Sequence, residues 1–158
     1  MIKHSNASGE TVKIIDLDHY LPFLIVSISN NLYRSASRYY QSRFGIGVTE
    51  WRVLTALAAA PNSTANRLCE IGRLDKAAAS RSLKVLESSG HVAIARHKSD
   101  ARKRIVAFTP AGRSLYEELI AVAKNRQERV AAGLTAQETD MLIALLTRVR
   151  ANSAKLEE

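Results

Sequence analysis

The sequence offers little support for a disulfide, a membrane span or a secretion signal. Its 158 residues include one cysteine, Cys69, so no disulfide can form within the chain, and this fits a reducing compartment. No apolar run approaches the roughly 20 residues that a helix needs to cross a bilayer. The N-terminus lacks the apolar run of a signal peptide. We therefore expect a cytoplasmic protein without a membrane partner.

The sequence also lacks the motifs that mark common enzymes and metal sites. It has no nucleophile elbow, phosphate loop or dinucleotide fingerprint. Its four histidines do not stand at zinc-like spacing from other ligands. We expect no enzyme activity, no metal and no cofactor, and a small enzyme using an aromatic pocket is kept only as an alternative.

Positive charge is plentiful and unevenly spread. The chain is 46% hydrophobic and 24% charged, which is enough apolar content for a core, and its formal net charge is +8. Residues 67–104 carry ten basic and four acidic side chains, whereas residues 105–158 carry seven of each. The local excess predicts a face that binds a polyanion.

Helical spacing of apolar residues and capping residues predict the first three helices. The first is expected from Asp18, with Pro22 in its first turn, and it breaks at residues 44–47. Thr49 is expected to cap the second, and Thr64 the short third, which Gly72 closes. Residues 1–15 have no usable periodicity and predict a mobile tail or a short strand.

The second half of the chain predicts three more helices and a hairpin. A helix from Asp75 ends at Gly90, and strands follow at 92–95 and 105–108, joined by the charged loop 97–103. Pro110 opens a helix that can run to residue 133, and a capping box at Thr135 and Glu138 opens the last. The predicted fold is mainly α, with six helices and a small β-hairpin.

The centre of the chain has the order of a winged helix-turn-helix: two helices joined by a tight turn at 72–74, then the hairpin. One helix fits the major groove of duplex DNA, and long cations on a hairpin can follow the backbone or enter a minor groove. We predict that this module binds double-stranded DNA. The predicted contacts are Thr64, Lys76, Ala77, Ala78, Ser80, Arg81 and Lys84 on the helices, and Lys98, Arg102 and Lys103 on the hairpin.

These residues resemble the MarR family of bacterial transcriptional regulators. The resemblance covers roughly residues 20–155. It rests on the run Leu68-x5-Leu74-Asp75-Lys76-x3-Ser80-Arg81-x4-Leu86-x3-Gly90, then Asp100-Ala-Arg102, then Phe108-Thr109-x2-Gly112.

The resemblance implies an obligate homodimer with interlocked N- and C-terminal helices. It also implies a pseudo-palindromic operator and repression relieved by a small aromatic or phenolic ligand. Lys76, Ser80, Arg81 and Lys84 would lie in the major groove and Arg102 in the wing, where Asp100 would pair with a nearby arginine. Ala77-Ala78-Ala79 offers methyl groups and few hydrogen bonds, which shifts specificity toward DNA shape.

Four segments follow from this reading. They are a flexible tail at 1–17, a dimerisation helix at 18–47, the winged helix-turn-helix at 48–108 and dimerisation helices at 109–158. From helix patterning alone, the outer apolar stripes could pack within one chain or across two. A two-fold dimer spaces two recognition helices one duplex turn apart, which favours the second arrangement.

Two further sites and two alternatives stay open. Aromatic residues in the first two helices suggest a pocket for an aromatic effector, with Tyr33, Arg38, Tyr39 and Trp51 as candidates, and with Arg34 or Arg52 as further partners for a ligand carboxylate. Cys69 is expected to be a small core residue, with thiol-based redox sensing as the alternative. The second alternative is a protein-interaction module whose basic face binds an acidic partner.

Overall fold

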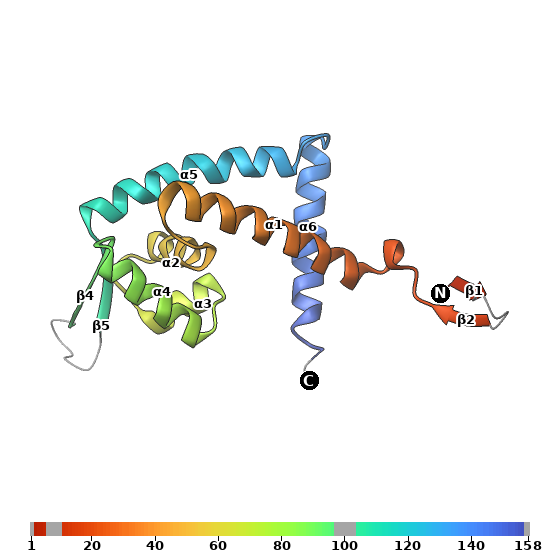
Figure 1. Cartoon of the computed structure of the whole chain (residues 1–158), viewed down its shortest axis with the longest axis horizontal. Coiled ribbons are helices and arrows are strands. Elements are labelled where there is room, and N and C mark those ends of the chain that lie inside the picture. The colour runs from red at the N-terminus through yellow and green to blue at the C-terminus, as the bar shows by residue number, and fades with distance from the viewer. Residues whose placement is uncertain (1, 6–10, 97–103, 157–158) are drawn as a thin grey trace. The chain divides into compact units, whose positions relative to one another are not determined.

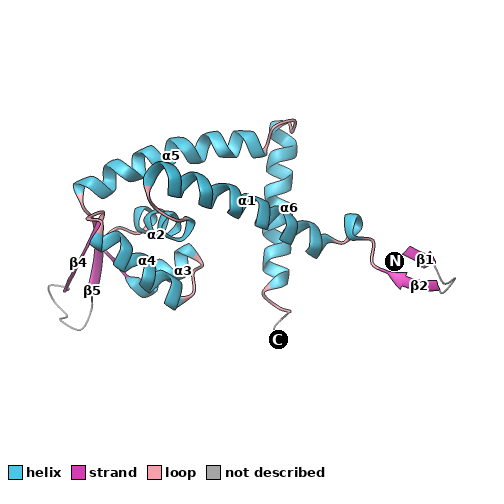
Figure 2. Ribbon diagram, in the orientation of Figure 1, coloured by secondary structure: helices cyan, strands magenta, loops and turns pink. Residues whose placement is uncertain are grey.

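The computed structural model describes residues 2–5, 11–96 and 104–156. These residues form six α-helices, one 3-10 helix and five strands (Figures 1 and 2), which confirms the mainly helical fold with a small hairpin. The chain divides into two compact units, residues 1–113 and 114–158. In chain order the elements are β1 (Ile2–Ser5), β2 (Thr11–Ile14), η1 (Leu17–His19), α1 (Leu21–Phe44), α2 (Val48–Ala59), β3 (Ser63–Thr64), α3 (Ala65–Gly72), α4 (Lys76–Ser88), β4 (Val92–Arg96), β5 (Arg104–Phe108), α5 (Pro110–Val130) and α6 (Ala136–Ser153).

Two short strands lie in the N-terminal segment, for which a mobile tail or a short strand was expected. Strands β1 and β2 pair antiparallel, with Ile2 opposite Ile14 and Ser5 opposite Thr11. Of the two outcomes considered for this segment, a mobile tail or a short strand, the second is observed in the described residues.

Two predicted helix starts are wrong by a few residues. Asp18 lies inside η1, which Asp16 caps, and Tyr20 is extended, so α1 begins only at Leu21. Helix α2 begins one residue before Thr49, because the Glu50 carboxylate accepts a hydrogen bond from the Gly47 N–H at 2.8 Å and sets the boundary there.

The caps predicted for the central helices and for α6 are confirmed. The Thr64 hydroxyl accepts from the Arg67 N–H at 3.3 Å, and the Asp75 carboxylate accepts from the Ala78 N–H at 2.8 Å. Thr135 and Glu138 form the expected reciprocal box at the start of α6. These side chains satisfy amides that a helix leaves unpaired at its first turn.

Helices α2, α3 and α4 pack with a three-stranded antiparallel sheet in the order β3-β5-β4. The two-residue strand β3, which the sequence pattern missed, pairs Ser63 with Val106 and Thr64 with Ile105. The core of this module is made of aliphatic side chains that are at most 4% exposed. They are Val53, Leu54, Leu57, Leu68, Ala79, Leu83, Leu86, Val92 and Val106.

The hairpin is tied to the start of α5 by a backbone contact. The Thr109 hydroxyl donates to the Gly90 carbonyl at 2.6 Å and accepts from the Gly112 N–H at 3.0 Å. A Cβ at Gly112 would collide with the carbonyl oxygen of His91. The Thr-x-x-Gly motif therefore has a steric reason: only glycine allows α5 to begin directly against the chain that enters β4.

Two helices carry large apolar side chains that one chain leaves exposed. Along α1, Ile28 is 56% exposed and Leu32 is 39% exposed. Along α6, apolar side chains are between 44% and 61% exposed, and they are Met141, Leu142, Ile143, Leu145 and Leu146. Exposed large apolar side chains on two helices are the kind of surface that a further packing partner can cover.

Candidate nucleic-acid interface

The turn between α3 and α4 is held by backbone and side-chain hydrogen bonds. Helix α3 ends at Gly72, and Arg73 takes a left-handed conformation (φ 50°, ψ 49°). The Leu74 N–H donates to the Cys69 carbonyl at 3.0 Å, after which Asp75 caps α4. The chain thus turns from one helix into the next within three residues, as a helix-turn-helix requires.

Arg52 from α2 completes this turn. One terminal nitrogen of its guanidinium donates to the carbonyl oxygens of Gly72 and Arg73, at 2.7 Å each. These carbonyls lie at the end of α3, where the helix offers them no partner. Arg52 was a candidate for holding a ligand carboxylate; the structure shows that its guanidinium already holds the helix-turn-helix.

The exposed side of α4 carries the predicted cations. Lys76, Arg81 and Lys84 are exposed, whereas Ala79 and Leu83 on the other side are buried. Within the described residues the ion pairs are His19 with Asp16 and Arg67 with Glu70, and neither involves these three cations. Lys76 and Lys84 are eight residues apart, about 12 Å along a helix, which matches the width of a major groove.

The remaining predicted contacts on the helices divide into exposed and structural positions. Ala77 and Ser80 are exposed beside the cations, and Ala78 is half-buried. Thr64 is half-buried, and its hydroxyl already caps α3. Lys98, Arg102 and Lys103 lie outside the described residues, as does Asp100.

The hairpin strands β4 and β5 stand beside α4 (Figure 1). Their register pairs Val92 with Phe108, Ile94 with Val106, and Arg96 with Arg104. The arginine pair at the end of this ladder nearest residues 97–103 was not singled out by the sequence pattern, because Arg96 and Arg104 are brought together only by the register.

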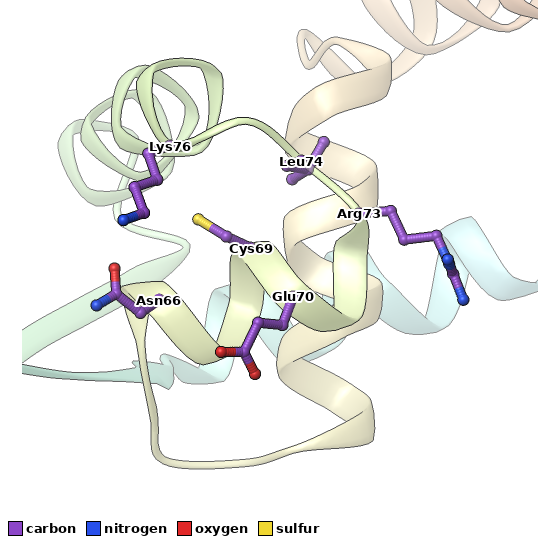
Figure 3. A pocket seen from close by; sticks show the side chains of 6 residues that line it. All are labelled: Asn66, Cys69, Glu70, Arg73, Leu74 and Lys76. Carbon is purple, nitrogen blue, oxygen red and sulfur yellow. The ribbon is translucent and has the colours of Figure 1, made fainter. Parts of the chain in front are cut away.

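A cavity of about 340 Å³ opens between α3 and α4 (Figure 3). The Cys69 side chain is half-buried and points into the space between Asn66 and Lys76, as Figure 3 shows. The cavity is lined by Asn66, Cys69, Glu70, Arg73, Leu74 and Lys76. None of the four residues predicted to bind an effector lines this cavity.

The aromatic residues of α1 and α2 pack on one another. The Tyr40 ring is 3% exposed and lies 6.0 Å from the Trp51 ring and 6.5 Å from the Phe44 ring, between centroids. Tyr39 is 39% exposed and Tyr33 is 54% exposed. Tyr40 therefore forms the centre of the cluster, Tyr39 packs at its edge with its ring centroid 6.1 Å from that of Tyr40, and Tyr33 is the more exposed of these two tyrosines.

The described residues offer no obvious metal site or membrane span. No three His, Cys, Asp or Glu side chains among them are grouped as metal ligands would be. No helix in the described ranges combines the length and apolarity that crossing a bilayer requires. His91 instead shares a hydrogen bond of 2.8 Å with the Ser89 hydroxyl.

Comparison with known proteins decides the family. Residues 44–103 match the family model described as the MarR family. A crystal structure of a MarR/EmrR family transcriptional regulator from Acinetobacter is 31% identical, with a TM-score of 0.81, and the match covers 89% of this chain and 99% of that one. The chain belongs to the MarR family.

Two other relatives extend the comparison. The HTH-type transcriptional regulator YdgJ of Bacillus subtilis is 30% identical over 118 residues, which are 75% of this chain and 72% of YdgJ. The PcaV regulator of Streptomyces coelicolor, solved with its natural ligand, shares the fold at 19% identity, with a TM-score of 0.79 and coverage of 90% and 99%.

This MarR-family chain is thus a DNA-binding transcriptional regulator with a winged helix-turn-helix. Its family and fold are those of regulators and not of enzymes. A module that uses its basic face only for an acidic protein is not favoured. Helix α4 is the second helix of the helix-turn-helix, and in that motif the second helix lies in the major groove of DNA.

Proposed function

We propose that the protein is a homodimeric repressor of a pseudo-palindromic operator in the cytoplasm, relieved by a small aromatic or phenolic ligand. The observation that carries the proposal is the exposed cationic face of α4, with Lys76, Arg81 and Lys84 free of ion pairs within the described residues. Asp75 caps the start of α4, and Arg52 holds the turn that precedes it.

Each residue on α4 has a distinct role in this proposal. Arg81 is the best candidate for reading a base, because a guanidinium can donate twice to the major-groove edge of guanine. Lys76 and Lys84 contact phosphates on either side of the groove, and Ser80 contacts a base edge or phosphate. Ala77 and Ala78 offer methyl groups to thymine. Thr64 positions the first turn of α3, and Lys98, Arg102 and Lys103 act at the wing.

The dimer follows from the exposed apolar faces of α1 and α6. Their large side chains, including Leu32 and Leu145, would be an aggregation liability on a lone chain. A second copy covers such faces and supplies a second recognition helix. A two-fold dimer then reads two half-sites about 34 Å apart, which is one turn of the duplex.

The effector proposal rests on the exposed aromatic and cationic side chains of the first two helices. Tyr33, Arg38 and Tyr39 are exposed, and Trp51 is half-buried. Rings stack on an aromatic ligand, and Arg38 can receive a carboxylate. The related fold of PcaV was solved with a natural ligand. Loss of ligand response with retained DNA binding in Tyr39→Ala or Arg38→Ala would support this site.

Selection of bound duplexes from a random pool tests the central proposal. We expect an enriched motif with two-fold symmetry and half-sites one helical turn apart. Arg81→Ala should weaken binding to that motif by about 1–3 kcal/mol while leaving random-duplex binding less affected. Lys13→Ala in β2 removes one positive charge from an exposed site outside the dimerisation helices and the helix-turn-helix, and it is the matched control. Enrichment of unrelated, asymmetric sequences would overturn the proposal.

A further inference from the structure

Strands β1 and β2 form a small hairpin of their own. Each has four residues, and they pair antiparallel with Ile2 opposite Ile14. Among the described residues the two strands contact each other extensively, and no contact of similar extent joins either one to a helix. A lone two-stranded hairpin is marginally stable at best in water, so it requires a further surface to pack on. The resemblance to the MarR family covers roughly residues 20–155, so this segment lies outside it.

Exposed apolar side chains continue from the hairpin into α1. Ile14 ends β2, Ile15 follows it, and both are exposed. Leu21, Leu24 and Ile28 stand at helical spacing on one face of α1 and are also exposed. That face of α1 is part of the apolar surface assigned above to the dimer. The hairpin therefore continues the proposed dimer surface along the chain, ahead of the first residue of α1.

The 3-10 helix η1 gives the connection between the hairpin and α1 a defined geometry. The Asp16 carboxylate accepts hydrogen bonds from the Asp18 N–H at 3.2 Å and from the His19 imidazole at 2.8 Å. The first of these bonds caps η1, and the extended Tyr20 then leads into α1. Because hydrogen bonds hold this connection, a hairpin that docks on a partner also fixes the start of α1.

Helix α6 has exposed apolar side chains on more than one side. Met141 and Ile143 are both exposed, and two residues are about 200° apart around a helix of 3.6 residues per turn. A helix that packs on one face buries a stripe about 100° wide. One helix of a partner therefore does not cover both side chains, and α6 offers apolar surface to a second element of the other copy.

We propose that β1, β2 and residues 15–17 form an N-terminal arm that packs on the second copy of the chain and extends the dimer interface. The second copy is the occupant because the arm continues the α1 surface that the dimer covers. Two-fold symmetry also lets each copy give one arm and receive one. Lys13 is exposed and neighbours Ile14 on the strand, so it lies on the opposite face, toward solvent. The arm presupposes the proposed homodimer and adds to it a segment outside the family resemblance.

Hydrogen exchange of the strand amides tests whether the second copy covers the arm. The full chain as a dimer is compared with Leu145→Asp, whose charge on α6 is expected to give a monomer. The amides of β1 and β2 should exchange roughly tenfold or more slowly in the dimer than in the monomer. The amides of α2, α3 and α4 are the internal control, because these helices pack within one chain. Equal protection of β1 and β2 in both forms would place the arm on its own chain and overturn the proposal, as would rapid exchange in both.

Substitutions in β2 test the arm in the dissociation constant of the dimer. Ile14→Asp should raise that constant about tenfold for each arm, and so about a hundredfold for a dimer in which both arms carry it. Ile14→Thr keeps a β-branched side chain that suits a strand, and it should raise the constant about tenfold for the dimer. Lys13→Ala lowers the net charge by one, as Ile14→Asp does, but on the opposite face of the same strand. It should leave the constant within about twofold of the wild type.

Sedimentation over a range of protein concentrations measures this constant and separates the two claims. If both Ile14 variants dimerise as tightly as the wild type, the arm makes no part of the interface. If Lys13→Ala weakens the dimer as much as Ile14→Asp, the apolar face of the arm is not what the second copy covers. A wild-type chain that stays monomeric at every concentration would instead refute the homodimer itself, and the arm with it.

Discussion

Arg52 gives the sharpest test of how the helix-turn-helix is held. Its guanidinium donates to the carbonyls of Gly72 and Arg73, at 2.7 Å each. Arg52→Met keeps a long side chain but removes both donors. Hydrogen bonds from a charged group contribute about 1.5–3 kcal/mol, and because Arg52 is exposed we take about 1 kcal/mol for each bond. The expected loss is about 2 kcal/mol.

The loss should appear in both stability and DNA binding. For a chain of this length, about 2 kcal/mol corresponds to a fall of about 4–8 °C in the melting temperature, at fixed protein concentration. The freed turn lets α4 shift relative to α3, so binding to the selected operator should weaken more than binding to random duplex. Arg52→Lys keeps the charge and N–H donors but not the planar guanidinium, so it should recover part of both losses.

Lys13→Met is the control for the loss of one positive charge, since Lys13 is exposed in β2 and lies outside the dimerisation helices and the helix-turn-helix. If Arg52→Met has the melting temperature of the wild type and keeps its preference for operator over random duplex, Arg52 does not hold the helix-turn-helix. A fall in melting temperature with an unchanged operator preference would show that Arg52 stabilises the module without positioning α4.

Three other changes probe the rest of the chain. Gly112→Ala drives a methyl group into the His91 carbonyl and should cost about 3 kcal/mol or more, seen as a lower melting temperature; wild-type stability would contradict the close approach. Thr135 donates hydrogen bonds to Glu138 from its backbone N–H and its hydroxyl and so lowers the pKa of that carboxyl below its ordinary value of 4.5. Since the folded-state pKa is depressed, this contribution is present above pH 4.5 and is lost as the pH falls below it. Followed by circular dichroism between pH 5 and 3, the melting temperature of Glu138→Gln should depend less on pH than that of the wild type. An equal pH dependence in the two proteins would refute this contribution of Glu138. Leu145→Asp places a charge on the exposed apolar face of α6 and should give a monomer in sedimentation that no longer binds the operator. A variant that remains a dimer and binds the operator with wild-type affinity would exclude this face as the dimer interface.

The parts of the fold that sequence could predict are those set by neighbouring residues. Thr64, Asp75 and Thr135 each cap a helix through an amide three residues ahead, so their patterns are readable within one turn. The predicted starts of α1 and α2 were wrong, also for local reasons. Asp18 falls in a 3-10 turn, and the Glu50 side chain reaches back to Gly47 and moves the boundary of α2 ahead of Thr49.

The parts that sequence could not predict depend on contacts between distant residues. Strand β3 has two residues, and it forms only because β5 lies beside it about 40 positions later in the chain. The bonds of Arg52 reach 20 and 21 residues ahead. The pairing of Arg96 with Arg104 depends on hairpin register. No periodicity encodes such contacts, whereas the cationic face of α4 is encoded by 3.6-residue spacing and was predicted.

The backbone contact between Gly112 and His91 fixes the first turn of α5 against the residue that precedes β4. Because backbone touches backbone there, no side chain can change rotamer to absorb a small displacement. A displacement at the first turn of α5 therefore reaches the start of the hairpin directly, without a side chain in between.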